Sequence, residues 1–159
     1  MRARVLFAQE RWRQEQINPA GFSDIFNPRD LIVATGKDQM EVLAVAEETL
    51  QSQAVALVVA VLSKPLGLRE GRRLQLAAKA GGTTGLCVIP EGMGSNAAET
   101  RWQCGPVFDS NDSTLMRWEI IKNKSGTLGA WHVRWDHASR RIVVVSPAGD
   151  RSGAEDARD

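Results

Sequence analysis

The feature that most constrains the fold is a short, uninterrupted apolar run at residues 55–62. Its sequence, VALVVAVL, holds no polar residue and is rich in β-branched valine. Such a run predicts a strand buried on both faces, as strands are in a parallel sheet. The following run at 72–80, RRLQLAAKA, has helical composition, and the glycine pair at 81–82 ends it. A buried strand followed by a crossover helix is half of a βαβ unit, so the chain is predicted to be α/β.

The segments around this unit extend the same pattern. Residues 31–34 form a second apolar run, and Asp38 with Glu41 three residues later gives the capping-box pattern of a helix over 39–51. With a further apolar run at 85–89, three parallel strands joined by right-handed crossovers are expected. The helical spacing predicts a buried stripe of Met40, Leu43, Ala46 and Leu50.

The pattern changes after residue 90. A Gly-, Ser- and Asn-rich loop is followed by four short strand-like runs, at 100–104, 115–123, 130–136 and 141–146. Hairpin connections between them predict an antiparallel β-meander. In the third run Trp131, Val133 and Trp135 alternate with polar residues, so the two sets are expected on opposite faces. Residues 1–147 are predicted to be one α/β domain and residues 148–159 a disordered tail.

Composition and charge restrict the function classes. The 159 residues are 43% hydrophobic and 25% charged, which is typical of a globular domain. The net charge of +1 argues against electrostatic binding by the whole molecule but leaves room for a local patch, so any DNA contact is expected to be indirect or weak. No apolar run approaches the ~20 residues of a membrane span. We therefore expect a cytoplasmic protein without a membrane contact.

Catalytic motifs are scarce in the sequence. No cysteine and histidine pair has the spacing of zinc ligands, and no GxxxxGK[ST] motif occurs. The GGTTG run at 81–85 lies between a helix and a strand, the opposite order from a P-loop. Cys87 is predicted to be a plain buried thiol, and both histidines are predicted to be surface residues. We expect no metal, no cofactor and no enzymatic activity, in a domain suited to binding.

Several separated blocks resemble the ImuA family. They are GFSDIFNPRDLIV at 21–33, the glutamate pair at 47–48, RRLQLAA at 72–78, TRW at 100–102, WE at 118–119 and KSGTLGAWHVRW at 124–135. RRLQLAA with the spaced TRW after it is the most specific, and the resemblance covers about residues 5–145. ImuA proteins are RecA-like and accompany the ImuB and ImuC polymerase proteins in SOS-induced translesion synthesis. The resemblance therefore implies a partial RecA-like core, here without the N-terminal Walker A region.

The residues at 5–8 are compatible with either a strand or the start of an amphipathic helix. The RecA likeness favours a strand. The same likeness places Val61, or Ala60 if the register slips by one, where RecA has its Walker B aspartate. Neither side chain can hold a magnesium ion, so Val61 marks a lost metal-binding position. Glu10 is a loose match to the water-polarising glutamate of RecA.

IIKNK at 120–124 is similar to a RecA segment whose lysines lie at the filament interface and reach the neighbouring subunit's nucleotide. The resemblance thus implies that Lys122 and Lys124 are interface or phosphate-contacting residues. Arg72 and Arg73, in the specific block, are candidates for the same role. Each basic pair taken alone is otherwise typical of a solvated surface.

The family resemblance implies a non-catalytic accessory protein of the SOS response. It would dock through a sheet edge and the C-terminal hairpin on an ImuB-like protein or on RecA, and an exposed edge would also favour self-association. Two alternatives stay open. One is a SulA-like inhibitor of cell division that binds FtsZ. The other is an ATPase completed in trans by a partner, with Lys122 and Lys124 acting at the partner's nucleotide.

Overall fold

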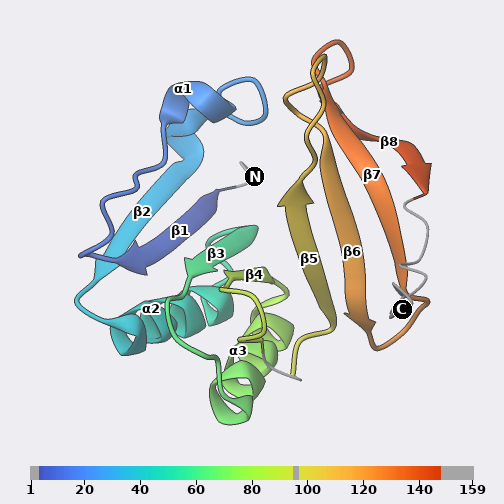
Figure 1. Cartoon of the computed structure of the whole chain (residues 1–159). Helices are drawn as coiled ribbons and strands as arrows, with labels where there is room; N and C mark the ends of the chain where they lie inside the picture. Colours follow the sequence, from blue (N-terminus) through green and yellow to red (C-terminus); the bar gives the residue numbers. More distant parts are fainter. Residues whose placement is uncertain (1–3, 95–96, 148–159) are drawn as a thin grey trace. The chain divides into compact units, whose positions relative to one another are not determined.

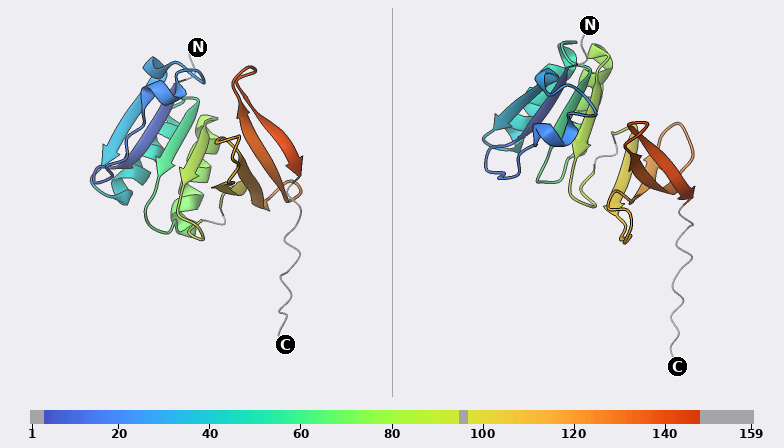
Figure 2. Two further views of the ribbon diagram at one scale, coloured as in Figure 1. Left: turned by 45° about the horizontal axis from the view of Figure 1, so that its top comes forward. Right: turned by 90° about the horizontal axis from the view of Figure 1, so that it is seen from above.

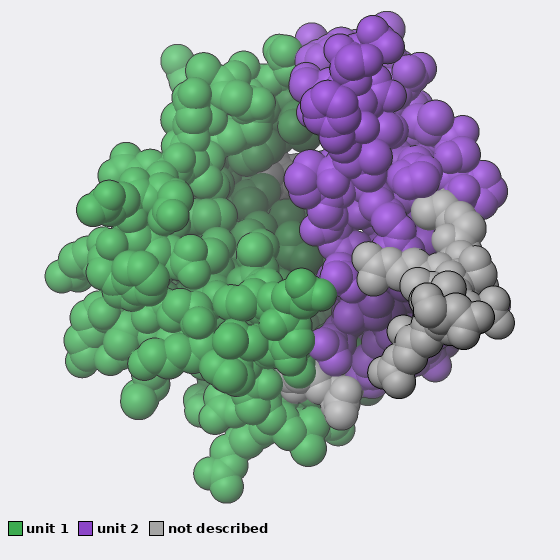
Figure 3. All heavy atoms as spheres, viewed as in Figure 1, with its two compact units in different colours: residues 1–98 green, residues 99–159 purple. Residues whose placement is uncertain are grey.

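A computed structural model describes residues 4–94 and 97–147 of the chain (Figure 1). These residues belong to two compact units, Met1–Ala98 and Glu99–Asp159, coloured separately in Figure 3. That residues 1–147 act as one domain stays a prediction, and the tail predicted at 148–159 lies outside the described residues. None of the described helices is long and apolar enough to cross a membrane.

The first unit is built on a parallel sheet, sheet A. Its elements follow in the order β1 (Val5–Glu10), α1 (Pro19–Phe22), the 3-10 turn η1 (Pro28–Asp30), β2 (Leu31–Gly36), α2 (Gln39–Gln51), β3 (Leu57–Val61), α3 (Leu68–Gly81) and β4 (Thr84–Val88). The strand order is β2-β1-β3-β4, and every neighbouring pair is parallel. The α/β prediction is confirmed, and residues 5–8 belong to a strand at the interior of the sheet.

Helix α2 begins where the capping pattern predicts. The side chain of Asp38 accepts a hydrogen bond from the Glu41 N–H at 3.0 Å, and the Glu41 carboxylate accepts one from the Lys37 N–H at 2.7 Å. Two N–H groups at the helix start are thereby satisfied. These bonds fix the direction in which α2 leaves the carboxyl end of β2.

The buried stripe of α2 differs from the prediction in one position. Val42, Ala46 and Leu50 are buried, whereas Met40 is 78% exposed. The expectation for Met40 was wrong. The helix meets the sheet through Val42, Ala46 and Leu50, which are four residues apart, and Met40 lies on the opposite side of the helix from Val42. Leu43 packs at the margin of the core, as expected.

Helices α2 and α3 lie on the same face of sheet A (Figures 1 and 2). Strand alternation turns one set of side chains toward them, and Leu6, Ala8, Val58 and Ala60 form the core with the helices. The opposite face carries apolar side chains from all four strands. These are Val5, Phe7, Leu31, Val33, Leu57, Val59, Val61, Leu86 and Val88.

The connection between β1 and β2 runs in the opposite direction along the sheet from the two helical connections. A right-handed crossover therefore places it on the face away from α2 and α3. Gln9 agrees with this placement, because it is buried on that face and its Nε2 donates to the Glu15 carbonyl at 3.1 Å.

The close approach of α2 and α3 depends on Gly81. A Cβ atom added there would lie 1.9 Å from the Leu50 carbonyl oxygen, which is backbone and cannot rotate away. Gly82 then ends α3 with a φ of 61°, in the left-handed region that glycine adopts without strain. The glycine pair therefore does two separate things: it lets the helices touch, and it ends the second one.

The second unit is an antiparallel sheet, sheet B. Its strands are β5 (Thr100–Pro106), β6 (Met116–Asn123), β7 (Gly129–Asp136) and β8 (Arg141–Pro147), in the order β5-β6-β7-β8. The predicted meander is confirmed. Two irregularities of register, at Arg101/Trp102 and at His132/Val133, were not predicted. Such bulges have no strong sequence signal when no glycine marks them.

Aspartates hold two turns of this unit. Asp112 accepts bonds from the N–H and hydroxyl of Thr114, and Asp136 accepts bonds from the N–H and hydroxyl of Ser139. These hydrogen bonds hold the pKa of both carboxyls below the usual value, and the bond from the hydroxyl has the larger effect. The stability they contribute is present above the ordinary pKa and is lost as the pH falls through the lowered one.

Replacing Gly81 with alanine tests the contact between α2 and α3. Gly81→Ala is expected to lower the free energy of unfolding by about 1–3 kcal/mol, because the added methyl group forces the helices apart. Gly21→Ala is the matched control, since a Cβ there would have no neighbour within 4 Å. The control should change the free energy by between zero and about +1 kcal/mol. Chemical denaturation of both variants measures this, and equal effects would contradict the close approach.

Candidate functional site

Open parallel sheets bind ligands at the carboxyl ends of their strands, where successive connections leave in opposite directions. In sheet A the connection from β1 leads to β2 on one side, and that from β3 leads to β4 on the other. The point between the ends of β1 and β3 is therefore the candidate site. We call it the switch point, and the residues at or next to these strand ends include Glu10, Arg13, Gln39, Val61 and Ser63.

Glu10 is the most unusual residue of the switch point. It ends β1, it is 3% exposed, and its Oε2 atom is buried without a hydrogen-bond partner in the described part of the chain. Its register partner Gly36 is packed so closely on the start of α2 that an added Cβ would lie 2.9 Å from the Val42 nitrogen. A buried carboxyl oxygen without a hydrogen-bond partner costs free energy, so Glu10 is expected to destabilise the fold.

Arg13 lies in the turn directly after Glu10. Its N–H donates to the Glu10 carbonyl at 3.2 Å, and its guanidinium carbon lies 5.4 Å from the centre of the Trp12 ring. Its Nε is also buried without a partner among the described residues. One turn thus holds an unpaired acceptor and an unpaired donor.

Gln39 fixes the other side of the switch point. Its Oε1 accepts from the N–H groups of Ser63 at 3.0 Å and Lys64 at 2.8 Å, and its Nε2 donates to the Lys64 carbonyl at 3.3 Å. The first turn of α2 is thereby tied to the loop that follows β3. These three bonds hold the end of β3, including Val61, in place.

Val61 is the last residue of β3 and is half-buried on the face away from the helices. Ala60 is buried and faces α2 and α3. Both positions put hydrocarbon where an oxygen ligand would be needed for a metal ion. No group of three or more His, Cys, Asp or Glu that could hold a metal ion occurs among the residues that the structure describes.

The charged side chains at the start of α2 satisfy each other. Lys37 Nζ lies 3.0 Å from Glu41 Oε1. The bond from the Lys37 N–H lowers the pKa of the Glu41 carboxyl, and the side-chain bond to Glu41 raises the pKa of Lys37. Both side chains are exposed, so the pair contributes little to stability.

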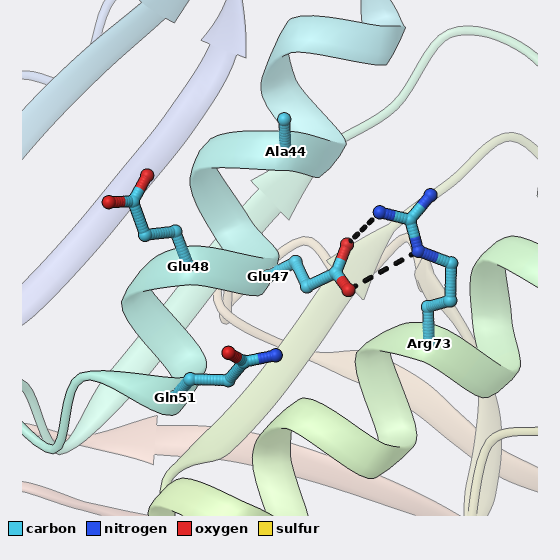
Figure 4. A pocket seen from close by; sticks show the side chains of 5 residues that line it. All are labelled: Ala44, Glu47, Glu48, Gln51 and Arg73. Atoms are coloured by element: carbon cyan, nitrogen blue, oxygen red, sulfur yellow. Dashed lines mark hydrogen bonds and ion pairs between the residues drawn. The ribbon is translucent and has the colours of Figure 1, made fainter.

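The structure brings Arg73 onto helix α2. Its Nε donates to Glu47 Oε1 at 3.2 Å and its Nη2 donates to Glu47 Oε2 at 2.5 Å (Figure 4). Arg73 and Glu47 line an open hollow together with Ala44, Glu48 and Gln51. Glu47 of the glutamate pair and Arg73 of the RRLQLAA block, which are separate in the sequence, therefore meet in one contact between α2 and α3.

The remaining predicted site residues lie apart from this contact. Arg72 donates to Gln75 Oε1 at 2.5 Å on the exposed side of α3. Lys122 lies in β6, opposite Arg101 of β5. Lys124 follows β6, and its Nζ lies 3.4 Å from Glu99 Oε1. The lysines belong to the second unit and the arginines to the first, so neither unit by itself brings the four together.

The two cysteines lie in different units, as Cys87 is in β4 and Cys104 is in β5. Cys87 is half-buried and Cys104 is exposed. Burial raises the pKa of both thiols. Neither is therefore activated as a nucleophile.

The fold defines a class: a parallel α/β unit followed by an antiparallel β-meander. No family model matches the chain. The chain is 32% identical over 127 residues to Protein ImuA of Caulobacter vibrioides strain NA1000 / CB15N, a match that covers 77% of the chain and 48% of that protein. Protein ImuA of the strain ATCC 19089 / CIP 103742 / CB 15 gives the same figures.

The chain therefore belongs to the ImuA family. It spans about half the length of the curated relatives it matches. The crystal structure of SulA from Pseudomonas aeruginosa is a partial likeness of fold, with a TM-score of 0.45 and 24% identity over 55% of this chain and 71% of that one.

Replacing Glu10 tests whether the switch point carries a destabilising charge. Glu10→Met keeps the length of the side chain and removes the unpaired oxygen, so the free energy of unfolding should rise by about 1 kcal/mol or more. The control is Glu15→Met, which changes the same charge at an exposed position in the following segment. Thermal or chemical denaturation measures both. A loss of stability in Glu10→Met would show that the carboxylate supports the fold.

Proposed function

We propose that this chain is a non-catalytic, RecA-like accessory protein of the SOS response that supports error-prone translesion synthesis with ImuB- and ImuC-type partners. The observation that carries the proposal is the relationship to ImuA, which supports a DNA-damage-related role in SOS mutagenesis. A cytoplasmic location accords with this role and stays a prediction.

The chemistry of the switch point supports a binding role. Hydrolysis of a nucleotide requires groups that hold phosphate and metal. The end of β3 offers only the side chains of Ala60 and Val61, and Gln39 uses its amide to tie the loop after β3 to α2. Glu10 at the end of β1 is buried, so it is not open to a substrate as it stands.

The edges of sheet A support a protein contact. Its outer strands are β2 and β4. Both carry exposed apolar side chains. In β2, Ile32 is 43% exposed and Val33 is 56% exposed; in β4, Leu86 is 50% exposed and Val88 is 47% exposed. An edge strand presents backbone N–H and C=O groups to a further strand, and apolar side chains beside it add area to the contact. We assign the contact with an ImuB-like protein, or with RecA, to these edges.

Lysine substitutions at the edges test this assignment. Val33→Lys with Leu86→Lys should weaken binding to an ImuB-type protein at least tenfold, because each introduces a charge into an apolar contact. The matched control is Val144→Lys, an exposed valine on the outer strand of sheet B. Titration of the purified proteins measures the affinities. A wild-type chain that binds neither the ImuB-type protein nor RecA would remove the proposal.

Two further assays separate the alternatives. The proposal expects no change in FtsZ polymerisation or GTPase activity, and inhibition would favour the SulA-like role instead. It also expects no nucleotide hydrolysis from the chain mixed with its partner beyond that of the partner alone. Added hydrolysis that Lys122→Ala abolishes would instead support an ATPase completed in trans.

A further inference from the structure

The two faces of sheet B differ sharply in chemistry. The register places the tryptophans Trp102, Trp118 and Trp131 on one face, together with Val133 and Trp135. The ring centroids of Trp118 and Trp131 lie 6.1 and 6.4 Å from that of Trp102. The opposite face carries Arg101, Arg117, Glu119, Lys122, His132, Arg134, Asp136 and Arg141. We call this second surface the basic face.

Several contacts confirm that these side chains share the basic face. Arg101 is the register partner of Lys122, and Arg117 is that of His132. Arg117 forms an ion pair with Glu119, two residues along the same strand. His132 Nδ1 lies 3.2 Å from the hydroxyl of Ser146 on β8. The surface therefore extends across all four strands.

The charge on the basic face exceeds that of the whole chain. The four strands place four arginines, one lysine and two carboxylates on the basic face, which gives it an excess of three positive charges. The net charge of all 159 residues is only +1. Both carboxylates are engaged, Glu119 with Arg117 and Asp136 with Ser139. The +1 total, which predicts weak contact with DNA, thus conceals a local concentration of positive charge in sheet B.

The spacing of these groups suits a chain of phosphates. Neighbouring strands are about 4.8 Å apart, and same-face residues along a strand are about 7 Å apart. The cations therefore form an array and not a single pocket. An array of cations can contact the successive phosphates of a polyanion. Arginine, which supplies four of the five cations, is the side chain that pairs most readily with phosphate oxygens.

The width of sheet B argues against its insertion into the major groove of a duplex. The major groove of B-DNA is about 12 Å wide and admits a helix or a two-stranded ribbon. Four strands in sheet B extend over about 14 Å between the outer backbones alone, at about 4.8 Å a step. Because the tryptophans lie on the other face, bases cannot stack on them while the phosphates contact the arginines.

We propose that the basic face of sheet B binds the phosphate backbone of single-stranded DNA without base preference. The choice of DNA over RNA rests on the proposed function. The phosphate contact rests on the charge and spacing of the basic face alone, and does not depend on any protein partner.

Fluorescence anisotropy of a labelled oligo(dT) strand tests the proposal with the full chain. Arg101→Glu with Arg134→Glu should weaken binding at least tenfold. It should also make the slope of log K against log salt shallower by about 1.4, because two phosphate contacts are lost. Arg69→Glu with Lys79→Glu is the matched control, with the same change of charge on exposed positions of α3, and should stay within twofold of wild type.

A milder variant keeps the test valid if the charge reversal unfolds sheet B. Arg134→Gln with Arg141→Gln changes two exposed residues of the basic face and should weaken binding at least threefold, with the circular dichroism unchanged. No binding of wild type at 50 mM salt would overturn the proposal, as would equal losses in the face and control variants.

Oligo(rU) and duplex DNA complete the set of probes. Tighter binding of oligo(rU) than of oligo(dT) would overturn the choice of DNA, and tighter binding of a duplex would overturn the choice of a single strand. Binding of oligo(dT) by a chain that binds neither the ImuB-type protein nor RecA would support this inference while removing the proposed function, so the two can fail separately.

Discussion

The contact of α2 and α3 with each other and with one face of sheet A is the constraint on which the rest of the first unit depends. Leu50 is 2% exposed, its carbonyl lies against Gly81, and its side chain contacts Gly85 in β4. The Arg73–Glu47 pair joins the same two helices at the surface. Because both helices occupy one face, the connection from β1 to β2, which contains α1 and η1, is the part of the first unit that runs on the opposite face.

The same arrangement explains the character of the switch point. Gln39 in the first turn of α2 holds the loop after β3, and Gly36 lets that turn approach β1. The edge that results is well ordered by hydrogen bonds, yet it keeps a buried carboxylate oxygen unpaired at Glu10. Proteins retain such a cost at sites where a further group is to be bound. At the end of β3, the side chain of Val61 is hydrocarbon and cannot ligate a metal ion.

Much of the fold could be predicted from local signals. The apolar run at 55–62, the cap at Asp38 and the glycines at 81–82 fixed β3, α2 and the end of α3. The position of Met40 was predicted wrongly because apolar residues at helical spacing can define more than one stripe, and the sequence does not say which stripe meets the sheet. The partners of Arg73 and Gln39 could not be predicted, since both bonds join residues that are distant in sequence. The basic face could not be found from net charge, because it arises only when strand register brings distant cations together.

The protein contact that we propose lies on the edges of sheet A. Hydrogen–deuterium exchange of the full chain, with and without a purified ImuB-type protein, tests it most directly. New protection is expected in Leu31–Gly36 or Thr84–Val88, the two outer strands, with little change in α2 and α3. Protection confined to the α2 and α3 surface, or no change at all, would contradict it.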